Sequence, residues 1–498
     1  MSKTAMHAPI PPVQLDTTAQ MPLYNQLYAG LRDAILSGQL APGMRLPATR
    51  ALASALQISR NTVVNAFDQL FAEGYLEGRV GDGTYVTRTL PDEMLRVAQK
   101  PSITTTRPTQ SRHLSKRGEI LAATSVTTER QKGRSVAFRP GIPAFDAFPS
   151  EIWSRLASRR WRRPPGDLVN YSDAAGYRPL REAIATYLGA ARGVRCVPEQ
   201  VLIVSGSQQG IDLAARVLLD PGDAVWFEEP GYLGARAALT AAEAQLVPVP
   251  VDQEGLNVAV GLARCLKAHM VYVTPSHQFP LGVTMSLTRR LALLDWAAHA
   301  GAWVLEDDYD SEYRYAGRPL ASLQGLDSTG RVIYLGTFSK VLFPSLRMGY
   351  LVVPPDLIDP FTAARAITDR QAPVLDQAIV TDFIEEGHFT RHIRRMRTLY
   401  AARQALLVEL AHRELAGLLT VHPADAGMHL VGWLADGTND QVISQLAATH
   451  GVDAPGLSEY HLEQAQQSGI LLGYTAVEEA DIRIGVLHLG KALSTAVV

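Results

Sequence analysis

Residues 21–88 carry three apolar stripes of helical spacing, separated by short turns and followed by a glycine-rich hairpin pattern. The first stripe ends at Gly38, as expected of a helix C-terminus. A second helix is predicted over residues 49–56, a third follows after a short turn, and a hairpin is centred on Gly81 and Gly83. The inward positions of the first and third helices are Leu23, Leu27, Leu31, Ile35, Val63, Phe67 and Leu70. This order of elements predicts a winged helix-turn-helix.

A winged helix-turn-helix reads double-stranded DNA with the first residues of its second motif helix, which face base edges in the major groove. We expect base and backbone contacts near the start of that helix, phosphate contacts from two arginines, and a wing with two glycines. The predicted DNA-binding residues are Ser59, Arg60, Asn61, Thr62 and Asn65, with Arg45 and Arg50 on phosphates and Gly81 and Gly83 in the wing. A three-helix interaction module with ordinary surface arginines is the alternative.

The remaining chain divides by composition and periodicity into an arm, a linker and a larger unit. Residues 1–20 hold several prolines and predict a flexible arm, and residues 89–135 are rich in Thr, Ser, Arg and Lys. We interpret the second stretch as a basic linker, which either lies along DNA or is a solvated tether. Strand and helix patterns alternate from 136 to about 378, which predicts a mostly parallel α/β sheet, and residues 379–498 predict a small α+β domain.

A lysine stands among hydroxyl side chains in the stretch GTFSKVLFPSLRMGY, residues 336–350. The amine of Lys340 can condense with an aldehyde, while Thr337, Ser339 and Arg347 offer donors for a phosphate monoester. Pyridoxal 5'-phosphate has both an aldehyde and a phosphate. A Gly/Ser turn with a surface lysine is the alternative interpretation of this stretch.

An apolar run ends in acids at AWVLEDDYDSEYRY, upstream of the lysine. In a strand, Asp307 and Tyr309 lie on one face because side chains alternate with a period of two. A carboxylate keeps a pyridine nitrogen protonated, and a phenol can hydrogen-bond the 3'-oxygen of the same ring. Ligands of open α/β sheets bind where strands end, as this run does. A plain acidic loop is the alternative.

Two further stretches of the sequence fit a phosphorylated ring. The stretch VLIVSGSQQGIDLAARVL predicts a strand, a tight turn and a helix, so Ser207 and Gln208 lie at a helix start that suits an anion. Tyr232 follows a Pro-Gly turn and can stack on a flat ring, although a core or interface tyrosine fits equally well.

Taken in order, these motifs resemble the aminotransferase-like domain of the MocR group of GntR-type bacterial transcription regulators, and the predicted DNA-binding unit resembles the other half of that group. The motifs are SGSQQG, EEPGY, TPSHQFPLG, EDDYDSEYRY, GTFSK and SLRMGY. The resemblance implies fold-type I architecture, a pyridoxal 5'-phosphate cofactor and a head-to-tail, domain-swapped homodimer. It also implies that the chain regulates transcription from a DNA operator.

The same resemblance assigns roles to single residues. It implies an internal aldimine on Lys340, Asp307 at the pyridine nitrogen, Tyr309 at the 3'-oxygen, Tyr232 against the ring, and a phosphate cradle of Ser207, Gln208, Thr337 and Arg347. His277 or Gln278 stands where related aminotransferases place an asparagine on the cofactor, in a motif that is one residue longer here.

Two positions bear on what the domain senses. Amino-acid aminotransferases hold a substrate carboxylate with a bidentate arginine, but Leu471 and Gly234 stand where relatives carry such arginines, and Arg483 is a poorer candidate on the final helix. We therefore expect a regulator that senses pyridoxal 5'-phosphate itself, or else an amino acid or amine. A working aminotransferase that carries a DNA-binding module is the alternative.

Composition limits the other possibilities. The chain has a net charge of −2 and a pI of about 6.7, so its overall charge gives no indication of nucleic-acid binding. Cys196 and Cys265 lie far apart without metal-ligand spacing, so we expect no metal site, and the sequence shows no signal or membrane segment. A cytoplasmic protein is the expectation.

Overall fold

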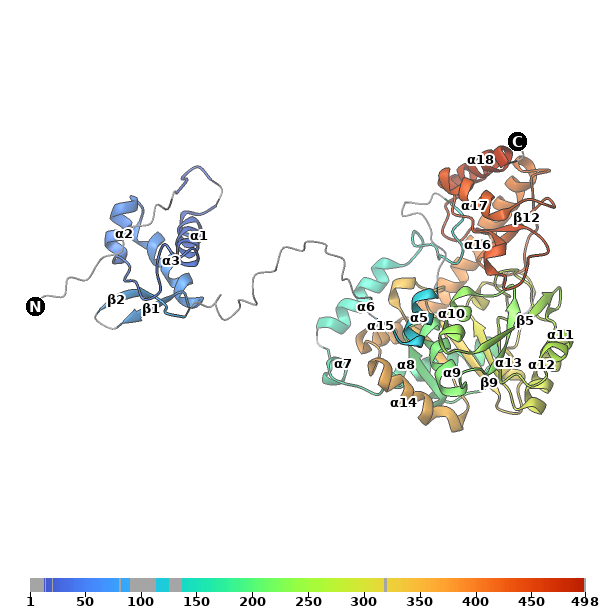
Figure 1. Ribbon diagram of the computed structural model, residues 1–498. Helices are drawn as coiled ribbons and strands as arrows, with labels where there is room; N and C mark the ends of the chain where they lie inside the picture. Colours follow the sequence, from blue (N-terminus) through green and yellow to red (C-terminus); the bar gives the residue numbers. More distant parts are fainter. Residues whose placement is uncertain are drawn as a thin grey trace, which may run out of the picture. The chain divides into compact units, whose positions relative to one another are not determined.

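The computed structural model describes residues 13, 15–19, 21–79, 82–89, 113–124, 137–162, 164–317 and 320–496 (Figure 1). Contacts divide the chain into two compact units, residues 1–112 and 113–498. No helix in these described ranges is long and apolar enough to span a membrane.

The first unit is a winged helix-turn-helix, as the sequence predicted. Its elements are α1 (Leu23–Leu36), α2 (Thr49–Leu56), α3 (Arg60–Ala72), β1 (Leu76–Arg79) and β2 (Gly83–Val86). The apolar stripes of α1 and α3 are buried against each other because both present Leu or Phe at helical spacing. Gln57 ends α2 in the left-handed conformation (φ 55°), and Ser59 caps α3 by accepting a hydrogen bond from the backbone N–H of Thr62 (3.1 Å).

The second unit is built on an eight-stranded sheet in the order β3-β10-β9-β8-β7-β4-β5-β6. The strands are β3 (Val201–Val204), β4 (Ala224–Glu229), β5 (Gln245–Asp252), β6 (Gly255–Leu256), β7 (Met270–Val273), β8 (Trp303–Asp308), β9 (Val332–Thr337) and β10 (Gly349–Val352). The pairs from β5 through β4, β7 and β8 to β9 are parallel, whereas β10 is antiparallel to both of its neighbours. The predicted, mostly parallel α/β sheet is confirmed.

Helices cover both faces of this sheet, so successive residues of each strand are buried on opposite sides (Figure 1). On β4, for example, Val225 and Phe227 pack with α9 and α10, whereas Trp226 packs with α12. One face is covered by α9 (Ser207–Leu218), α10 (Leu233–Ala241) and α14 (Ile358–Asp369). The other face is covered by α8 (Arg178–Arg192), α11 (Val258–Arg264), α12 (Leu287–Ala300) and α15 (Val374–Glu385).

Further helices complete this part of the unit. They are α5 (Lys116–Ala123), α6 (Ser150–Arg162), α7 (Gly166–Val169) and α13 (Leu323–Leu326). The helix α6 packs on α15 through Leu156, which is buried, and leaves its polar face exposed.

A small antiparallel sheet forms the C-terminal part of the second unit. Its strands are β11 (Leu419–Val421), β12 (His429–Leu434) and β13 (Gly469–Gly473), and its helices are α16 (His388–Glu414), α17 (Asp440–Thr449) and α18 (Glu479–Ala496). The core of this part also takes in Phe138 and Ala144, while Phe389 and Ile393 of α16 pack with the large sheet's helices. The helix α16 is therefore shared between the two cores.

Candidate cofactor site

The candidate site lies where β8 and β9 end, beside the N-terminus of α9. Lys340 follows β9, and its Nζ donates a hydrogen bond to the carbonyl oxygen of Gly141 (2.8 Å). Gly141 has φ +72°, and a Cβ there would lie 2.8 Å from the lysine nitrogen. The positive φ favours a glycine at 141, and a Cβ there would displace the lysine amine from its present position.

Burial changes the protonation of this lysine. It lowers the pKa of Lys340, and the negative charges of Asp310 and Asp307 oppose that effect. A lowered pKa increases the share of neutral amine at neutral pH, and the neutral amine is the form that attacks an aldehyde.

Asp307 points its carboxylate into the same site from the end of β8. Its Oδ2 accepts a hydrogen bond from the hydroxyl of Tyr272 (2.7 Å), while its Oδ1 is buried and has no hydrogen-bond partner. Burial raises the pKa of Asp307 to about 7, although the Tyr272 hydrogen bond acts in the opposite direction. A buried acceptor without a donor is costly, so Oδ1 fits a ligand N–H such as that of a protonated pyridine.

The neighbouring acids serve other purposes. Asp308 forms an ion pair with Arg192 (2.8 Å) and accepts from the hydroxyl of Tyr334 (2.5 Å). Glu306 accepts from the backbone N–H groups of Leu323 (2.8 Å) and Gln324 (2.9 Å). The acidic run is therefore buried and divided between separate partners, unlike a solvated acidic loop.

An anion cradle is formed at the N-terminus of α9. The Arg347 guanidinium donates to the carbonyl oxygen of Ser205 (2.9 Å) and lies 3.2 Å from the position of a Cβ on Gly206, whose φ is +97°. No side chain caps α9, which begins at Ser207, so its first N–H groups are available to an anion. Thr337, the last residue of β9, accepts from the backbone N–H of Ser339 (3.1 Å).

Tyr232 and Gln208 are packed together around a glycine. Gln208 donates from Nε2 to the carbonyl oxygen of Gly234 (2.8 Å), and its Oε1 is buried without a partner. A Cβ on Gly234 would lie 2.5 Å from Cζ of Tyr232 and 2.6 Å from Oε1 of Gln208, so a larger residue does not fit there without rearrangement. Burial, followed by the charge of Asp307, raises the pKa of Tyr232 to about 12.

The two candidates in the TPSHQFPLG motif have different partners. His277 lies with Nδ1 2.9 Å from the hydroxyl of Tyr309 and 3.0 Å from Oδ2 of Asp310. Gln278 instead donates to the carbonyl oxygens of Pro230 (2.8 Å) and Phe279 (2.7 Å). Of the two, only His277 joins Tyr309, because the amide of Gln278 is already bound to the backbone.

An apolar cluster occupies the position where relatives are expected to place a carboxylate-binding arginine. Leu471 is fully buried on β13, packed with Tyr460, Val431 and Leu457. Arg483 lies on α18 and is exposed. Neither the apolar neighbours of Leu471 nor the exposed Arg483 places a positive charge beside the Leu471 side chain.

Three residues of the site were missed in the sequence: Gly141, Tyr272 and Asp310. Tyr272 lies in the uniformly apolar strand β7, and Gly141 is 199 positions from Lys340, so no local pattern marks either one. Asp310 belongs to the acidic run beside Asp307 and Tyr309, so it was the one missed residue that the sequence could have indicated. Among the described residues, no group of three or more His, Cys, Asp or Glu side chains could hold a metal ion.

The predicted DNA-binding residues lie on the first unit. Ser59, Arg60, Asn61 and Asn65 are exposed around the start of α3, Thr62 is half-buried beside them, and Arg50 is exposed on α2. Arg45 lies against the wing, with its Nε 3.0 Å from the position of a Cβ on Gly83. Gly81, also assigned to the wing, lies outside the described residues.

The fold and the lysine-centred site define a class of protein: an aminotransferase-like domain with pyridoxal 5'-phosphate as cofactor, joined to a DNA-binding winged helix-turn-helix. Family models match this division. Residues 149–486 match aminotransferase class I and II, and residues 23–86 match the bacterial regulatory proteins of the gntR family. The chain belongs to the MocR subfamily of GntR-type transcription regulators.

Known proteins resemble the chain over most of its length. It is 44% identical to the probable rhizopine catabolism regulatory protein MocR of Rhizobium meliloti, covering 96% of this chain and 95% of the relative. It is 30% identical to the pyridoxine biosynthesis transcriptional regulator PdxR of Corynebacterium glutamicum, covering 97% and 98%. The crystal structure of LysN, an α-aminoadipate aminotransferase from Thermus thermophilus, superposes with a TM-score of 0.71 at 29% identity and covers 77% of this chain and 98% of LysN.

Proposed function

We propose that this transcription regulator senses pyridoxal 5'-phosphate itself, through a covalent bond between Lys340 and the cofactor aldehyde. The observation that carries the proposal is the unpartnered, buried Oδ1 of Asp307 close to a lysine with a lowered pKa. Lys340 supplies the amine, Asp307 holds the pyridine nitrogen, and Tyr309 with His277 holds the 3'-oxygen. The phosphate is held by Ser207, Gln208, Thr337, Ser339 and Arg347, and Tyr232 stacks on the ring.

The apolar surroundings of Leu471 favour the cofactor over an amino acid as the effector. A substrate carboxylate at that position would lose its water without gaining a positive partner. Loss of one charge-assisted hydrogen bond costs about 1.5–3 kcal/mol. Loss of a bidentate arginine–carboxylate contact therefore lowers the affinity for an amino acid at least about tenfold. Gly234 offers no replacement, because Tyr232 and Gln208 fill the space around it. Among the relatives, PdxR is named for pyridoxine biosynthesis, which is consistent with this choice.

A second candidate is a regulator that responds to an amine or amino acid, or an aminotransferase that retains turnover. The presence of Lys340, Asp307 and Tyr309 together favours it, since these residues are sufficient to hold the cofactor in a reactive state. A 2-aminoadipate transaminase of Thermus thermophilus is 30% identical over 76% of this chain. The absence of an arginine at Leu471 counts against an amino-acid substrate.

We also propose that the protein acts in the cytoplasm, where the chromosome is, as a head-to-tail homodimer. Exposed apolar side chains support a partner surface on the second unit: Trp161, Val169, Tyr171 and Ile367 are at least 64% exposed. A symmetric dimer fits spaced half-sites on DNA.

The test compares DNA binding by three preparations of the full chain: apo protein, protein loaded with pyridoxal 5'-phosphate, and loaded protein with single amino acids or amines added. The operator is obtained by selection from a random duplex pool. We expect the cofactor alone to change operator affinity, because only a ligand with different affinities for two states can shift their populations. If the cofactor alone changes nothing, while one amine changes both the cofactor's absorbance and DNA affinity, the amine-sensor function replaces this one.

A further inference from the structure

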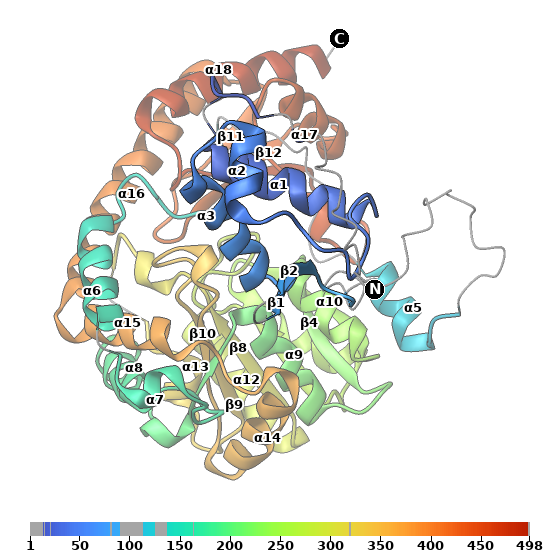
Figure 2. The same cartoon turned by 90° about the vertical axis from the view of Figure 1, so that its left-hand side faces the viewer.

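The second unit carries two groups of exposed arginines, here together called the basic ridge, on α6 and on the first turns of α16. Its exposed arginines are Arg155, Arg159 and Arg162 of α6 and Arg391, Arg394 and Arg395 of α16. The segment that leads into α6 contacts α16: Phe148 packs on His392, with ring centroids 5.9 Å apart, and Arg395 donates to the carbonyl oxygen of Ala147. Figure 2 shows both helices along the same side of the unit.

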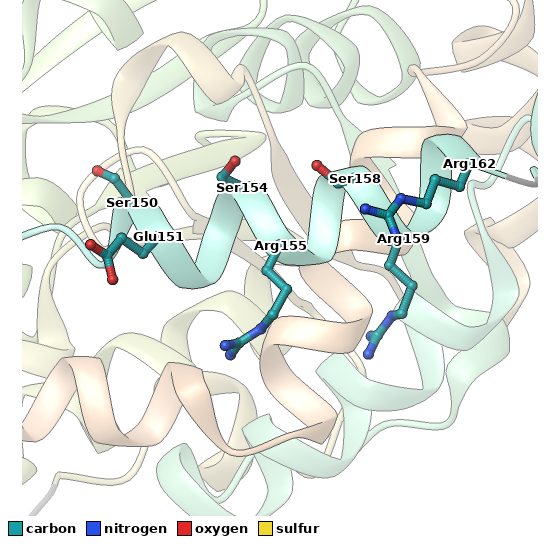
Figure 3. Close-up of a pocket in the computed structure, with 7 residues that line it drawn as sticks. All are labelled: Ser150, Glu151, Ser154, Arg155, Ser158, Arg159 and Arg162. Atoms are coloured by element: carbon teal, nitrogen blue, oxygen red, sulfur yellow. The ribbon is translucent and has the colours of Figure 1, made fainter.

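On α6 the ridge is hollowed and lined by hydroxyl and guanidinium groups. A hollow of about 800 Å³ is lined by Ser150, Ser154, Ser158, Arg155, Arg159 and Arg162, with Glu151 at its N-terminal end. Figure 3 shows the serines along one edge of the helix and the side chains of Arg155 and Arg159 leaving the other edge together. The helical rise places the three arginines within about 10 Å along the axis.

Contacts within the chain neutralise only part of the positive charge of the basic ridge. Arg159 pairs with Asp382 (2.8 Å) and Glu386 (2.5 Å). The guanidinium groups of Arg155, Arg162 and Arg394 make no ion pair or hydrogen bond with another residue that the structure describes. Arg162 lies in the last turn of α6, where the helix dipole stabilises its positive charge without a carboxylate partner.

The dipole does not account for the other two arginines. Arg155 lies in the middle of α6, and Arg394 lies in the second turn of α16, near the positive end of that helix. The first ten residues of α16, His388–Arg397, contain four arginines and no acid. Such a concentration of like charge is unfavourable in the free protein and is relieved by an external anion.

The DNA-binding unit itself has little excess positive charge. Residues 21–88 contain six arginines, no lysine and five acids. Two of the arginines are engaged within the unit, since Arg32 donates to the hydroxyl of Tyr75 and Arg79 pairs with Glu77. Affinity for DNA depends mainly on neutralised phosphates, so a nearly neutral unit gains from additional phosphate contacts elsewhere on the chain.

We propose that the basic ridge binds the sugar-phosphate backbone of DNA beyond the sequence that the winged helix-turn-helix reads. DNA is the partner that matches this surface, because arginine and serine side chains are the usual donors to phosphate oxygens. The proposal rests on DNA binding by the winged unit and does not depend on which effector the cofactor site senses. The contact is independent of sequence, since a backbone contact carries no base information.

The experiment measures binding of the full chain to two duplexes as a function of salt. The short duplex contains only the sequence selected from a random pool, and the long duplex adds about 30 arbitrary base pairs on each side, roughly three helical turns. The test variant combines Arg155→Gln, Arg162→Gln and Arg394→Gln. The control variant removes the same charge elsewhere, through Lys267→Gln, Arg483→Gln and Lys491→Gln, all exposed in the structure.

We expect the test variant to bind the short duplex normally and the long duplex at least tenfold more weakly. Its slope of log affinity against log salt should become shallower by about 2–3 on the long duplex, since each lost phosphate contact contributes about 0.9. Replacement of the same three arginines by lysine should restore most of the lost affinity, because the charge returns. The control variant should match the unmodified protein on both duplexes.

Three results would overturn the proposal. One is an unchanged affinity of the test variant for the long duplex, and another is an equal loss on the short and long duplexes. The third is a change in molar mass by light scattering, which would make the ridge an interface between copies of the chain. Unchanged thermal unfolding and cofactor absorbance of the test variant serve as the check that its fold is intact.

Discussion

Burial sets the chemistry of the two residues that we assign to the reactive part of the cofactor, Lys340 and Asp307. It lowers the pKa of the lysine and raises that of the carboxyl to about 7, so both groups are drawn toward their neutral forms. A positively charged pyridine N–H beside Oδ1 of Asp307 reverses this effect for the carboxyl, because an opposite charge favours ionisation. Cofactor binding and the ionisation of Asp307 are therefore linked.

Replacing Asp307 by Asn tests this link at a single atom. The amide oxygen can still accept from the Tyr272 hydroxyl, but the charge opposite the pyridine nitrogen is lost. We expect affinity for pyridoxal 5'-phosphate to fall about tenfold or more, the value of a charge-assisted hydrogen bond. Absorbance titration of the apo variant measures this affinity. An unchanged affinity would show that Asp307 does not face the ring nitrogen.

Replacing Lys340 by Ala tests the covalent bond. Borohydride reduction followed by dialysis and mass spectrometry should leave the cofactor attached to the unmodified protein and absent from the variant. Lys267→Ala is the matched control, because this lysine is exposed and distant in sequence from the site. Cofactor retained by Lys340→Ala, or lost from Lys267→Ala, would assign the bond to another amine.

Among the elements, the start of α3 is exposed, and its cap and the turn before it set its conformation. Ser59 fixes the first turn, so that Arg60 and Asn61 lie at the exposed helix start, whereas Arg45 lies beside the wing. A side chain at the start of the recognition helix meets base edges, and one beside the wing meets phosphates. The two arginines should therefore contribute differently to specificity.

Replacement by alanine separates these contributions. Arg60→Ala should cost about 1–3 kcal/mol on the selected operator and relax the preference at one base pair. Arg45→Ala should weaken operator and random DNA alike and flatten the salt slope by about 1. Fluorescence anisotropy with operator, single-substituted operators and random duplex measures both effects. The assignment fails if Arg60→Ala loses the same affinity on operator and on random DNA.

For the second unit as a whole, several buried carboxyls make stability depend on pH. Burial raises the pKa of Glu228, Glu306, Asp307 and Glu312 to about 7, from ordinary values of 3.8–4.5. Between about pH 4 and 7 the folded state then binds more protons at these groups than the unfolded state. Their contribution to stability falls as pH rises through that window, by up to about 1.4 kcal/mol per pH unit for each group.

The cofactor should remove the part of this pH dependence that belongs to Asp307. Urea unfolding of apo protein from pH 5 to 8 is compared with unfolding of the Asp307→Asn variant and of cofactor-saturated protein. We expect both comparisons to show a shallower loss of stability with rising pH than the unmodified apo protein, by up to about one proton. Identical slopes for the apo protein and the variant would contradict a raised pKa at Asp307.

The sequence by itself determined the elements whose signals are local. Apolar residues at helical spacing, followed by a glycine hairpin, are sufficient for the winged helix-turn-helix, because each helix carries its own buried stripe. Alternating strand and helix patterns likewise determined the mostly parallel sheet, and the motifs around Lys340 and Asp307 indicated the cofactor. The positions of these motifs at strand ends follow from the general rule for open α/β sheets.

Only the tertiary structure decided which side chains meet. Tyr272 contacts Asp307, which is 35 positions away in the sequence, and Gly141 contacts Lys340, which is 199 positions away. No periodic pattern of residues predicts contacts between segments so far apart. Packing likewise set the hydrogen-bond partners of His277 and its neighbour Gln278, because the Gln278 amide donates to backbone carbonyl oxygens while His277 lies beside Tyr309. Burial, and with it the pKa of each site residue, arises only when distant segments exclude water together.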